Sequence, residues 1–223
     1  MIRIQIIPTW RCNYYDFKKA APHGKNCEYC VIFSPMKTED THFQYNSVKR
    51  KIDRELTTGE WLDGLLLIRE QTRDNILFDF TGGEPTLYND FDKLVYLFSS
   101  IPSTSWVITS NTSMQNKIHD IFKYDASRKS CAGWTASWHP NGIRSFEEFV
   151  SNILTVKEYT RNISVTTVLH YSTMYNIEDQ IKKLDDLEIQ TQIHVYQAEG
   201  FSLFKEPETK QHERLLEVYE RIK

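Results

Sequence analysis

Apolar residues recur along the chain with two spacings, one typical of strands and one typical of helices. Six short runs rich in β-branched and aromatic residues are typical of strands; they lie at residues 3–8, 76–80, 106–109, 133–137, 163–169 and 191–196. Between them, apolar residues return every three or four positions, as in helices that bury one face. This alternation predicts an α/β fold built on a parallel sheet.

Side chains that cap helices precede several of the helical segments, namely Thr57, Asn89, Ser145 and Asn176. A glutamate follows three residues after Thr57 and after Ser145, which is the pattern of a capping box. The span 113–124 has a weaker helical pattern. Pro207 stands where the first turn of a last helix accepts proline. Six helices are therefore expected to alternate with the six strands.

The chain has the length of one domain, and nothing divides it. It has 223 residues, of which 40% are hydrophobic, and domains typically hold about 100 to 200 residues. No internal repeat, low-complexity tract or Gly/Ser linker interrupts the alternation. Two polar stretches at residues 13–26 and 31–55 are expected to be loop insertions. The prediction is a single domain over residues 1–223.

Charge and hydropathy exclude two broad classes of protein. Lys and Arg total 27 and Asp and Glu total 30, a net charge of −3, which lacks the basic footprint of a general nucleic-acid-binding protein. No run approaches the roughly 18 to 20 consecutive apolar residues of a membrane helix. Residues 1–6 lack the layout of a secretory signal. We therefore expect a cytoplasmic protein without a membrane segment.

Three of the four cysteines are close together in the sequence. Cys12, Cys27 and Cys30 fall within the first thirty residues, which is typical of a metal or cluster site rather than of a secreted disulfide scaffold. Three thiolates can hold a [4Fe–4S] cluster with one iron open, whereas an electron-transfer cluster takes four. Cys131 precedes the fourth strand, at the opposite end of the sheet, and is expected to be a small buried apolar side chain. One remaining cysteine cannot house a second cluster.

Chemically active side chains follow nearly every predicted strand. Ligands bind at the carboxyl ends of parallel strands, where loops and helix N-termini gather. In strand order, these ends carry Cys12, then Gly82, Gly83 and Glu84, then Ser110 and Asn111, then Ser137 and His139, then His170, and finally Gln197. The two glycines let the backbone approach a ligand closely, and the glutamate offers a carboxylate to an amino group. An α-amino acid bound to an open iron meets these demands.

These motifs together resemble the radical S-adenosylmethionine (radical SAM) superfamily. Three early cysteines, with Tyr29 before the last, are followed by TGGEP after the second strand. VITSNT, TASWHP and VTTVLH extend the resemblance over roughly residues 4–197. The spacing departs from the usual motif, because fourteen residues separate Cys12 from Cys27 where three are usual. The Cys27-x2-Cys30 half is intact.

The resemblance implies a partial (β/α)6 barrel of parallel strands, a [4Fe–4S] cluster and S-adenosylmethionine. The reduced cluster would cleave S-adenosylmethionine to methionine and a 5′-deoxyadenosyl radical, which abstracts hydrogen from a small-molecule, nucleoside or peptide substrate. An external reductant such as flavodoxin or ferredoxin would supply the electron. Recognition of the substrate would come from the core, the two insertions or a partner protein.

The resemblance also implies a role for each motif. The cluster ligands would be Cys12, Cys27 and Cys30. The residues in contact with S-adenosylmethionine would be Tyr29 at the adenine, Gly82, Gly83 and Glu84 at the amino group, Ser110, Asn111 and Ser137 at the ribose or carboxylate, and Gln197 at the adenosine. His139 and His170 are candidates for contact with the substrate.

Two other interpretations remain open from the residues alone. The three cysteines with His23 or His42 would also make a structural zinc site, and the protein would then be a zinc-stabilised α/β binding module without radical chemistry. In the second interpretation, the protein is a degenerate relative of the superfamily that binds the cofactor but acts only within a complex. The turn TGGEP directly after a strand favours the cluster, since a zinc knuckle does not account for it.

Overall fold

A computed structural model describes residues 1–9, 54–140, 145–169, 174–195 and 210–222. Six parallel strands form one sheet in which spatial order follows chain order. They are β1 (Ile2–Ile6), β2 (Ile76–Phe80), β3 (Thr104–Ser110), β4 (Cys131–Trp138), β5 (Ile163–Leu169) and β6 (Gln190–Val195). The predicted α/β class and all six strands are confirmed.

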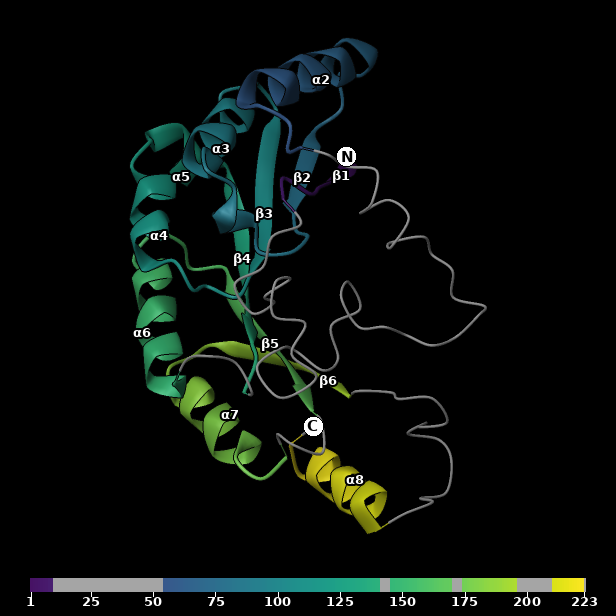
Figure 1. Cartoon of the computed structure of the whole chain (residues 1–223), viewed down its shortest axis with the longest axis vertical. Coiled ribbons are helices and arrows are strands. Elements are labelled where there is room, and N and C mark those ends of the chain that lie inside the picture. The colour runs from purple at the N-terminus through teal and green to yellow at the C-terminus, as the bar shows by residue number, and fades with distance from the viewer. Residues whose placement is uncertain (10–53, 141–144, 170–173, 196–209, 223) are drawn as a thin grey trace.

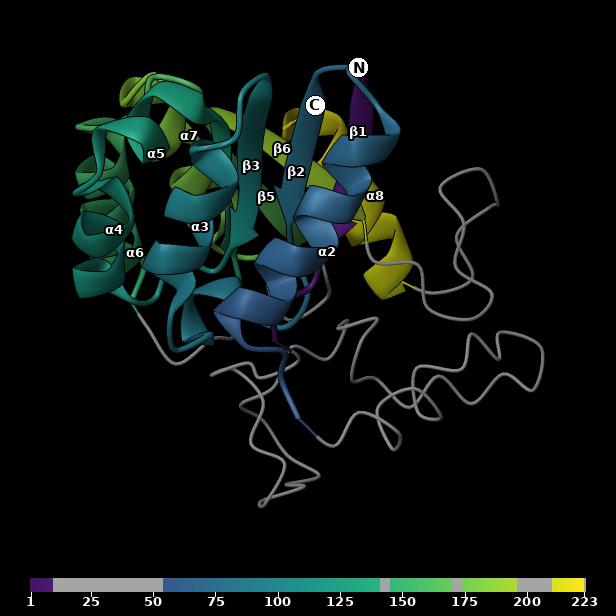
Figure 2. The same ribbon diagram turned by 90° about the horizontal axis from the view of Figure 1, so that it is seen from above.

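The helices follow the outer side of the curved sheet, and among the described residues no helix covers the opposite side (Figures 1 and 2). They are α2 (Thr58–Gln71), the 3-10 turn η2 (Pro85–Leu87), α3 (Phe91–Ser99), α4 (Gln115–Phe122), α5 (Asp125–Ser130), α6 (Phe146–Lys157), α7 (Ile177–Asp186) and α8 (Lys210–Ile222). Because each strand is followed by a crossover to a parallel neighbour, all carboxyl ends of the strands meet at one rim. This arrangement is a partial β/α barrel.

Helix starts agree with the capping patterns in part. Thr57 and Glu60 form the reciprocal capping box expected at the start of α2. Ser145 accepts a hydrogen bond from the Glu148 N–H at the start of α6. The expected cap at residue 89 is wrong: the N-cap of α3 is Asp90, without a side-chain cap bond.

Alternate strand residues pack against the helices to form the core. The largest fully buried side chains there are aromatic, and Phe78, Phe80 and Trp106 are 0% exposed. The rings contact one another, with 4.5 Å between the centroids of Phe78 and Phe98 and 5.3 Å between those of Phe80 and Phe91. A second cluster around Leu169 and Ile177 joins α7 to α8. The other set of strand residues faces the opposite way, and we call that side of the sheet the inner face.

Cys131 lies where the sequence placed it, at the amino end of β4 and away from the rim of carboxyl ends. Its side chain is partly buried against the core. Burial raises the pKa of this thiol to about 11, so it is a neutral apolar group at physiological pH. Within the described ranges, no helix combines the length and the apolar character needed to cross a bilayer.

Candidate functional site

Three of the expected site residues, from two neighbouring strand ends, are in direct contact. Glu84 follows β2, and Ser110 and Asn111 end and follow β3. The Ser110 hydroxyl donates to Oε1 of Glu84 at 2.8 Å, and the Asn111 N–H donates to Oε2 at 2.7 Å. Thr86 donates two further hydrogen bonds to Oε1, one from its hydroxyl at 2.6 Å and one from its N–H at 3.2 Å. The carboxylate therefore joins the ends of two strands.

The environment of Glu84 combines burial with hydrogen bonding. The residue is 1% exposed, and burial raises the pKa of its carboxyl group above the ordinary value. The four donors act against this shift, because they stabilise the charged form. Three of the four reach Oε1, and one reaches Oε2. A carboxylate oxygen has two lone pairs, so Oε2 has capacity for one more donor.

The turn before Glu84 packs against the chain that follows β1. Gly82 has φ +126°, a conformation that side chains rarely adopt. A Cβ added there would lie 2.7 Å from Cγ2 of Ile7 and 2.9 Å from the carbonyl oxygen of Thr9. The Gly83 N–H donates to that same carbonyl oxygen at 3.3 Å. Glycine at position 82 thus allows two backbone segments to come together at the rim.

A buried polar network that none of the sequence motifs predicted extends from Glu84 into the core. The Thr112 N–H donates to the Ser110 hydroxyl at 2.9 Å. Asn152 of α6 donates through Nδ2 to the Thr112 carbonyl oxygen at 3.0 Å, and Trp134 Nε1 donates to its hydroxyl at 3.3 Å. Thr112 also has φ +57°, and such strain persists where its surroundings fix it. The network therefore shapes the loop after β3.

Two further expected residues lie at the end of β4. Ser137 is half-buried on the inner face, paired in register with Thr166 of β5. His139 is partly buried just beyond the strand. Burial lowers the pKa of its imidazole to about 4, because a desolvated site disfavours the charged form. His139 is therefore neutral at physiological pH.

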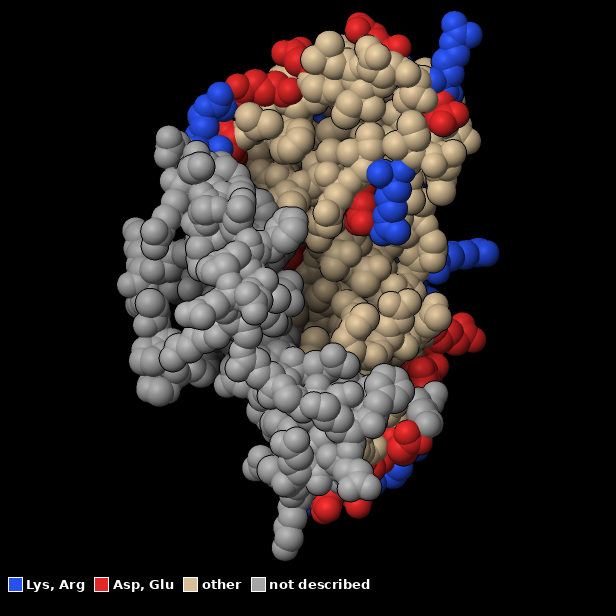
Figure 3. Space-filling model, turned by 90° about the vertical axis from the view of Figure 1, so that its right-hand side faces the viewer, with Lys and Arg blue, Asp and Glu red and all other residues tan. Residues whose placement is uncertain are grey.

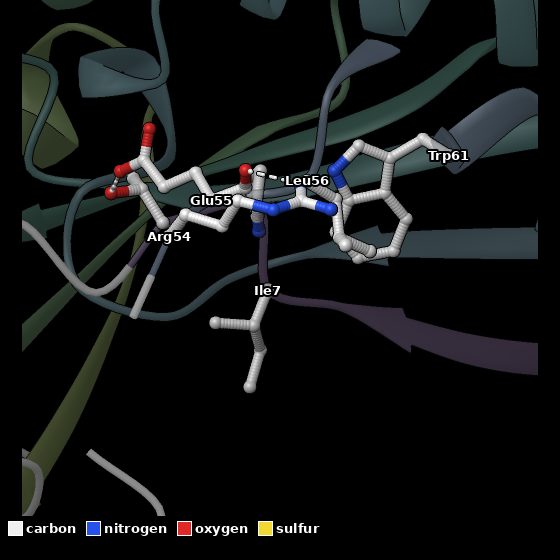
Figure 4. Close-up of a pocket in the computed structure, with 7 residues that line it drawn as sticks. Ile7, Arg54, Glu55, Leu56 and Trp61 are labelled. Carbon is white, nitrogen blue, oxygen red and sulfur yellow. Dashed lines mark hydrogen bonds between the residues drawn. The ribbon is translucent and has the colours of Figure 1, made fainter. Parts of the chain in front are cut away.

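A pocket of about 330 Å³ lies beside the turn (Figure 4). Its lining comes from the chain after β1, the segment before α2, and α2 itself: Ile7, Pro8, Thr9, Arg54, Glu55, Leu56 and Trp61. The Thr9 hydroxyl donates to the Glu55 carboxylate. The indole N–H of Trp61 is buried and has no hydrogen-bond partner in the described part of the chain. Thr9 thus borders both the pocket and the glycine turn.

The remaining expected site residues lie outside the described residues. These are Cys12, Cys27, Cys30, Tyr29, His170 and Gln197, with the insertion at 13–26 and all of the insertion at 31–55 except its last two residues. Among the residues that are described, no group of three or more His, Cys, Asp or Glu side chains is arranged to hold a metal ion.

No protein-family model and no curated protein sequence matches this chain. Solved structures do match it. The structure of anSMEcpe with bound AdoMet has a TM-score of 0.60 and 14% identity, covering 95% of this chain and 54% of that one. The structure of anSMEcpe with AdoMet and the Cp18Cys peptide has a TM-score of 0.61 and 14% identity, covering 99% of this chain and 59% of that one. The structure of Streptococcus suis SuiB bound to the precursor peptide SuiA has a TM-score of 0.56 and 12% identity, covering 98% of this chain and 46% of that one.

This chain spans about half the length of the proteins it matches. Nearly all of it is covered in each comparison, so the similarity includes the whole six-stranded sheet and the helices around it. At 12–14% identity, the similarity concerns architecture. The chain therefore has the partial β/α barrel fold of radical SAM structures.

Proposed function

We propose that this protein is a radical SAM enzyme that binds S-adenosylmethionine through Glu84 and its neighbours and a [4Fe–4S] cluster through Cys12, Cys27 and Cys30. The observation that carries the proposal is a buried carboxylate at the carboxyl ends of β2 and β3, in a sheet with this fold. Thr9, which accepts a hydrogen bond from the glycine turn, lies only three residues before Cys12 in the sequence.

The described residues fit the amino-acid end of S-adenosylmethionine. Its ammonium group is a donor of the kind that Oε2 of Glu84 can still accept, and a charged partner would offset the desolvation of the carboxylate. Ser110 is already bonded to Glu84 and Thr112, so its proposed contribution is to hold the carboxylate in place. Asn111 and Ser137 would contact the carboxylate or ribose, and Gly82 and Gly83 would shape the turn.

Tyr29 and Gln197 complete the proposed cofactor site at the adenine and the adenosine. When bound, the cluster supplies an electron that cleaves S-adenosylmethionine to methionine and a 5′-deoxyadenosyl radical, which abstracts hydrogen from the substrate. The protein has to exclude water and hold the reacting atoms within about 3 to 3.5 Å of one another. An external reductant such as flavodoxin or ferredoxin would provide the electron.

The substrate is a small molecule, a nucleoside or a peptide. Two of the similar structures hold a peptide, the Cp18Cys peptide in anSMEcpe and SuiA in SuiB. This favours a peptide among the three classes.

The direct test is anaerobic reconstitution with iron and sulfide. We expect a brown protein that cleaves S-adenosylmethionine to 5′-deoxyadenosine when reduced with dithionite. Cys27→Ala should lose both the chromophore and cleavage, whereas Cys131→Ala, which changes the partly buried cysteine at the far end of β4, should keep both. Colourless protein with stoichiometric zinc would contradict the proposal, as would a cluster that binds S-adenosylmethionine without cleaving it under any reductant.

The role of Glu84 predicts how cofactor affinity depends on pH. Below the raised pKa of Glu84 the carboxyl is protonated, and an ammonium group must displace that proton to bind. The affinity of the reconstituted protein for S-adenosylmethionine should therefore rise with pH, by about tenfold per unit well below that pKa, and level off above it. Isothermal titration calorimetry over the pH range in which the protein stays folded measures this dependence.

Glu84→Gln should bind more weakly and remove the pH dependence. Asp92→Asn is the matched control, because Asp92 in the first turn of α3 is also a buried carboxylate but pairs with Lys123, the residue after α4, and not with Glu84 or its donors. It should bind as the unmodified protein does. Equal affinity of Glu84→Gln and the unmodified protein at every pH would show that the ammonium group does not meet this carboxylate.

A further inference from the structure

The inner face of the sheet carries a group of uncharged polar side chains on β3, β4, β5 and β6. Register places side chains of neighbouring strands side by side in rows that cross the sheet. The first row is Thr109, Thr135, Ser164 and Gln190, and the second is Ser137, Thr166 and Gln192. We call these seven side chains the polar rows. Along each strand they alternate with residues that pack against the helices.

The chemistry of the polar rows is uniform. All seven side chains are hydroxyls or carboxamides, which both donate and accept hydrogen bonds. None is charged, and none is aromatic. The Thr135 and Ser164 hydroxyls lie 3.3 Å apart, so neighbouring members are close enough to engage one ligand together. The seven residues are half-buried or exposed. In Figure 3, the part of this side that is not grey is hollowed and mostly tan, with one blue and red pair near its middle.

Among the described strand residues, the Asp, Glu, Lys and Arg side chains on the inner face are in its other half, and the imidazole of His194 follows the polar rows two residues after Gln192 on β6. Arg3 of β1 and Asp79 of β2 form an ion pair at 2.7 Å, so they neutralise one another. A ligand with a phosphate, carboxylate or ammonium group over the polar rows would lose water without gaining a counter-charge, which is costly. The described face therefore selects against charged ligands at this place.

The absence of rings from the polar rows also bears on the ligand. Proteins that hold nucleobases usually stack them on aromatic or arginine side chains, and the rows offer neither. A peptide main chain, by contrast, presents alternating N–H and C=O groups, and hydroxyls and carboxamides match both. The rows also include Ser137, which we place beside the cofactor, so a ligand bound there would lie next to the reacting groups.

We infer that the polar rows bind the main chain of an uncharged, polar peptide segment, which is the substrate of this enzyme. The inference rests on the proposed function and narrows its substrate from three classes to one. Specificity would come from the absence of counter-charges as much as from hydrogen bonds, because acidic and basic segments would be rejected by desolvation.

The test is affinity selection with the full-length reconstituted protein and S-adenosylmethionine, read by mass spectrometry. The probes are three pools of acetylated and amidated decapeptides, one of Gly, Ser, Thr, Asn and Gln, one enriched in Asp and Glu, and one enriched in Lys and Arg. Guanosine is a fourth probe. We expect the uncharged pool to be retained at least tenfold more than the other three.

Two variants on neighbouring positions of β5 supply the control. Thr166→Val removes a hydroxyl from the polar rows and should lower retention of the uncharged pool about tenfold. Thr167→Val makes the same change on the opposite side of the strand, where the hydroxyl is buried without a partner among the described residues. It should leave retention unchanged.

Several outcomes would overturn the inference: no pool retained, equal retention of charged pools, preferential retention of guanosine, or equal effects of Thr166→Val and Thr167→Val. The proposed function fails separately. Retention of the uncharged pool without cleavage of S-adenosylmethionine would refute the radical chemistry and leave the peptide site standing. Cleavage of S-adenosylmethionine without retention of the uncharged pool would refute the peptide site and leave the radical chemistry standing.

Discussion

Gly82→Ala is expected to lower the free energy of unfolding by about 4 kcal/mol. Two costs add at this position. Alanine at φ +126° is strained by about 1 to 3 kcal/mol, and overpacking costs a similar amount. The new Cβ would lie 2.9 Å from the carbonyl oxygen of Thr9, a backbone atom that cannot rotate away, and 2.7 Å from Cγ2 of Ile7. Urea unfolding followed by tryptophan fluorescence measures the loss.

Gly64→Ala is the matched control, and its expected sign is opposite. Gly64 lies within α2, and a Cβ there meets nothing within 4 Å. Alanine in a helix interior is favoured over glycine by about 1 kcal/mol, so this variant should be slightly more stable than the unmodified protein. If Gly82→Ala unfolds at the same urea concentration as Gly64→Ala, the turn does not require glycine.

The strands and most helices were predictable because burial gave each a regular pattern. β5 is a run of alternating buried residues whose limits at residues 163 and 169 agree with the sequence prediction. α5 was missed for a physical reason: of its six residues, Ser127 is the buried one, so no apolar spacing reveals it. Hydrogen bonds hold it instead, including one at 3.0 Å from Trp106 Nε1 to the Ser127 carbonyl oxygen.

The site was predictable to the level of strand ends, and no further. Topology alone brings Glu84, Ser110 and Asn111 to one rim, and the structure puts them in contact. Which way each side chain points depends on the twist and register of the sheet. Ser110 is directed toward Glu84 and is 2% exposed, whereas Ser137 lies on the inner face. A list of residues after each strand does not distinguish these two orientations.

Asn152 did leave a signal in the sequence. It occupies a position on the buried face of α6, next to Ile153 and one turn after Phe149, where an apolar residue is expected. A polar side chain at such a position needs a buried partner, and the Thr112 carbonyl oxygen is that partner. The partner itself was not predictable, because it lies on a loop forty residues earlier in the sequence.

His139 is expected to make the fold sensitive to mild acid. Its pKa is lowered to about 4 by burial, against about 6.5 for an exposed histidine. Between these two values the unfolded chain binds a proton that the folded protein does not, so stability is fully present above pH 6.5 and is lost as the pH falls toward 4. The resulting loss between pH 7 and pH 4 is about 3 kcal/mol.

Glutamine at position 139 keeps a neutral polar side chain and cannot titrate, so His139→Gln isolates this contribution from every carboxyl group that also titrates in acid. We expect the difference in free energy of unfolding between the two proteins to be constant above pH 7, where the histidine is neutral in both states. It should then shift by about 3 kcal/mol in favour of the variant by pH 4. Urea unfolding at half-unit pH intervals measures the curve. A constant difference down to pH 4 would mean that the imidazole takes up its proton in the folded protein as readily as in the unfolded chain, and that His139 is open to solvent.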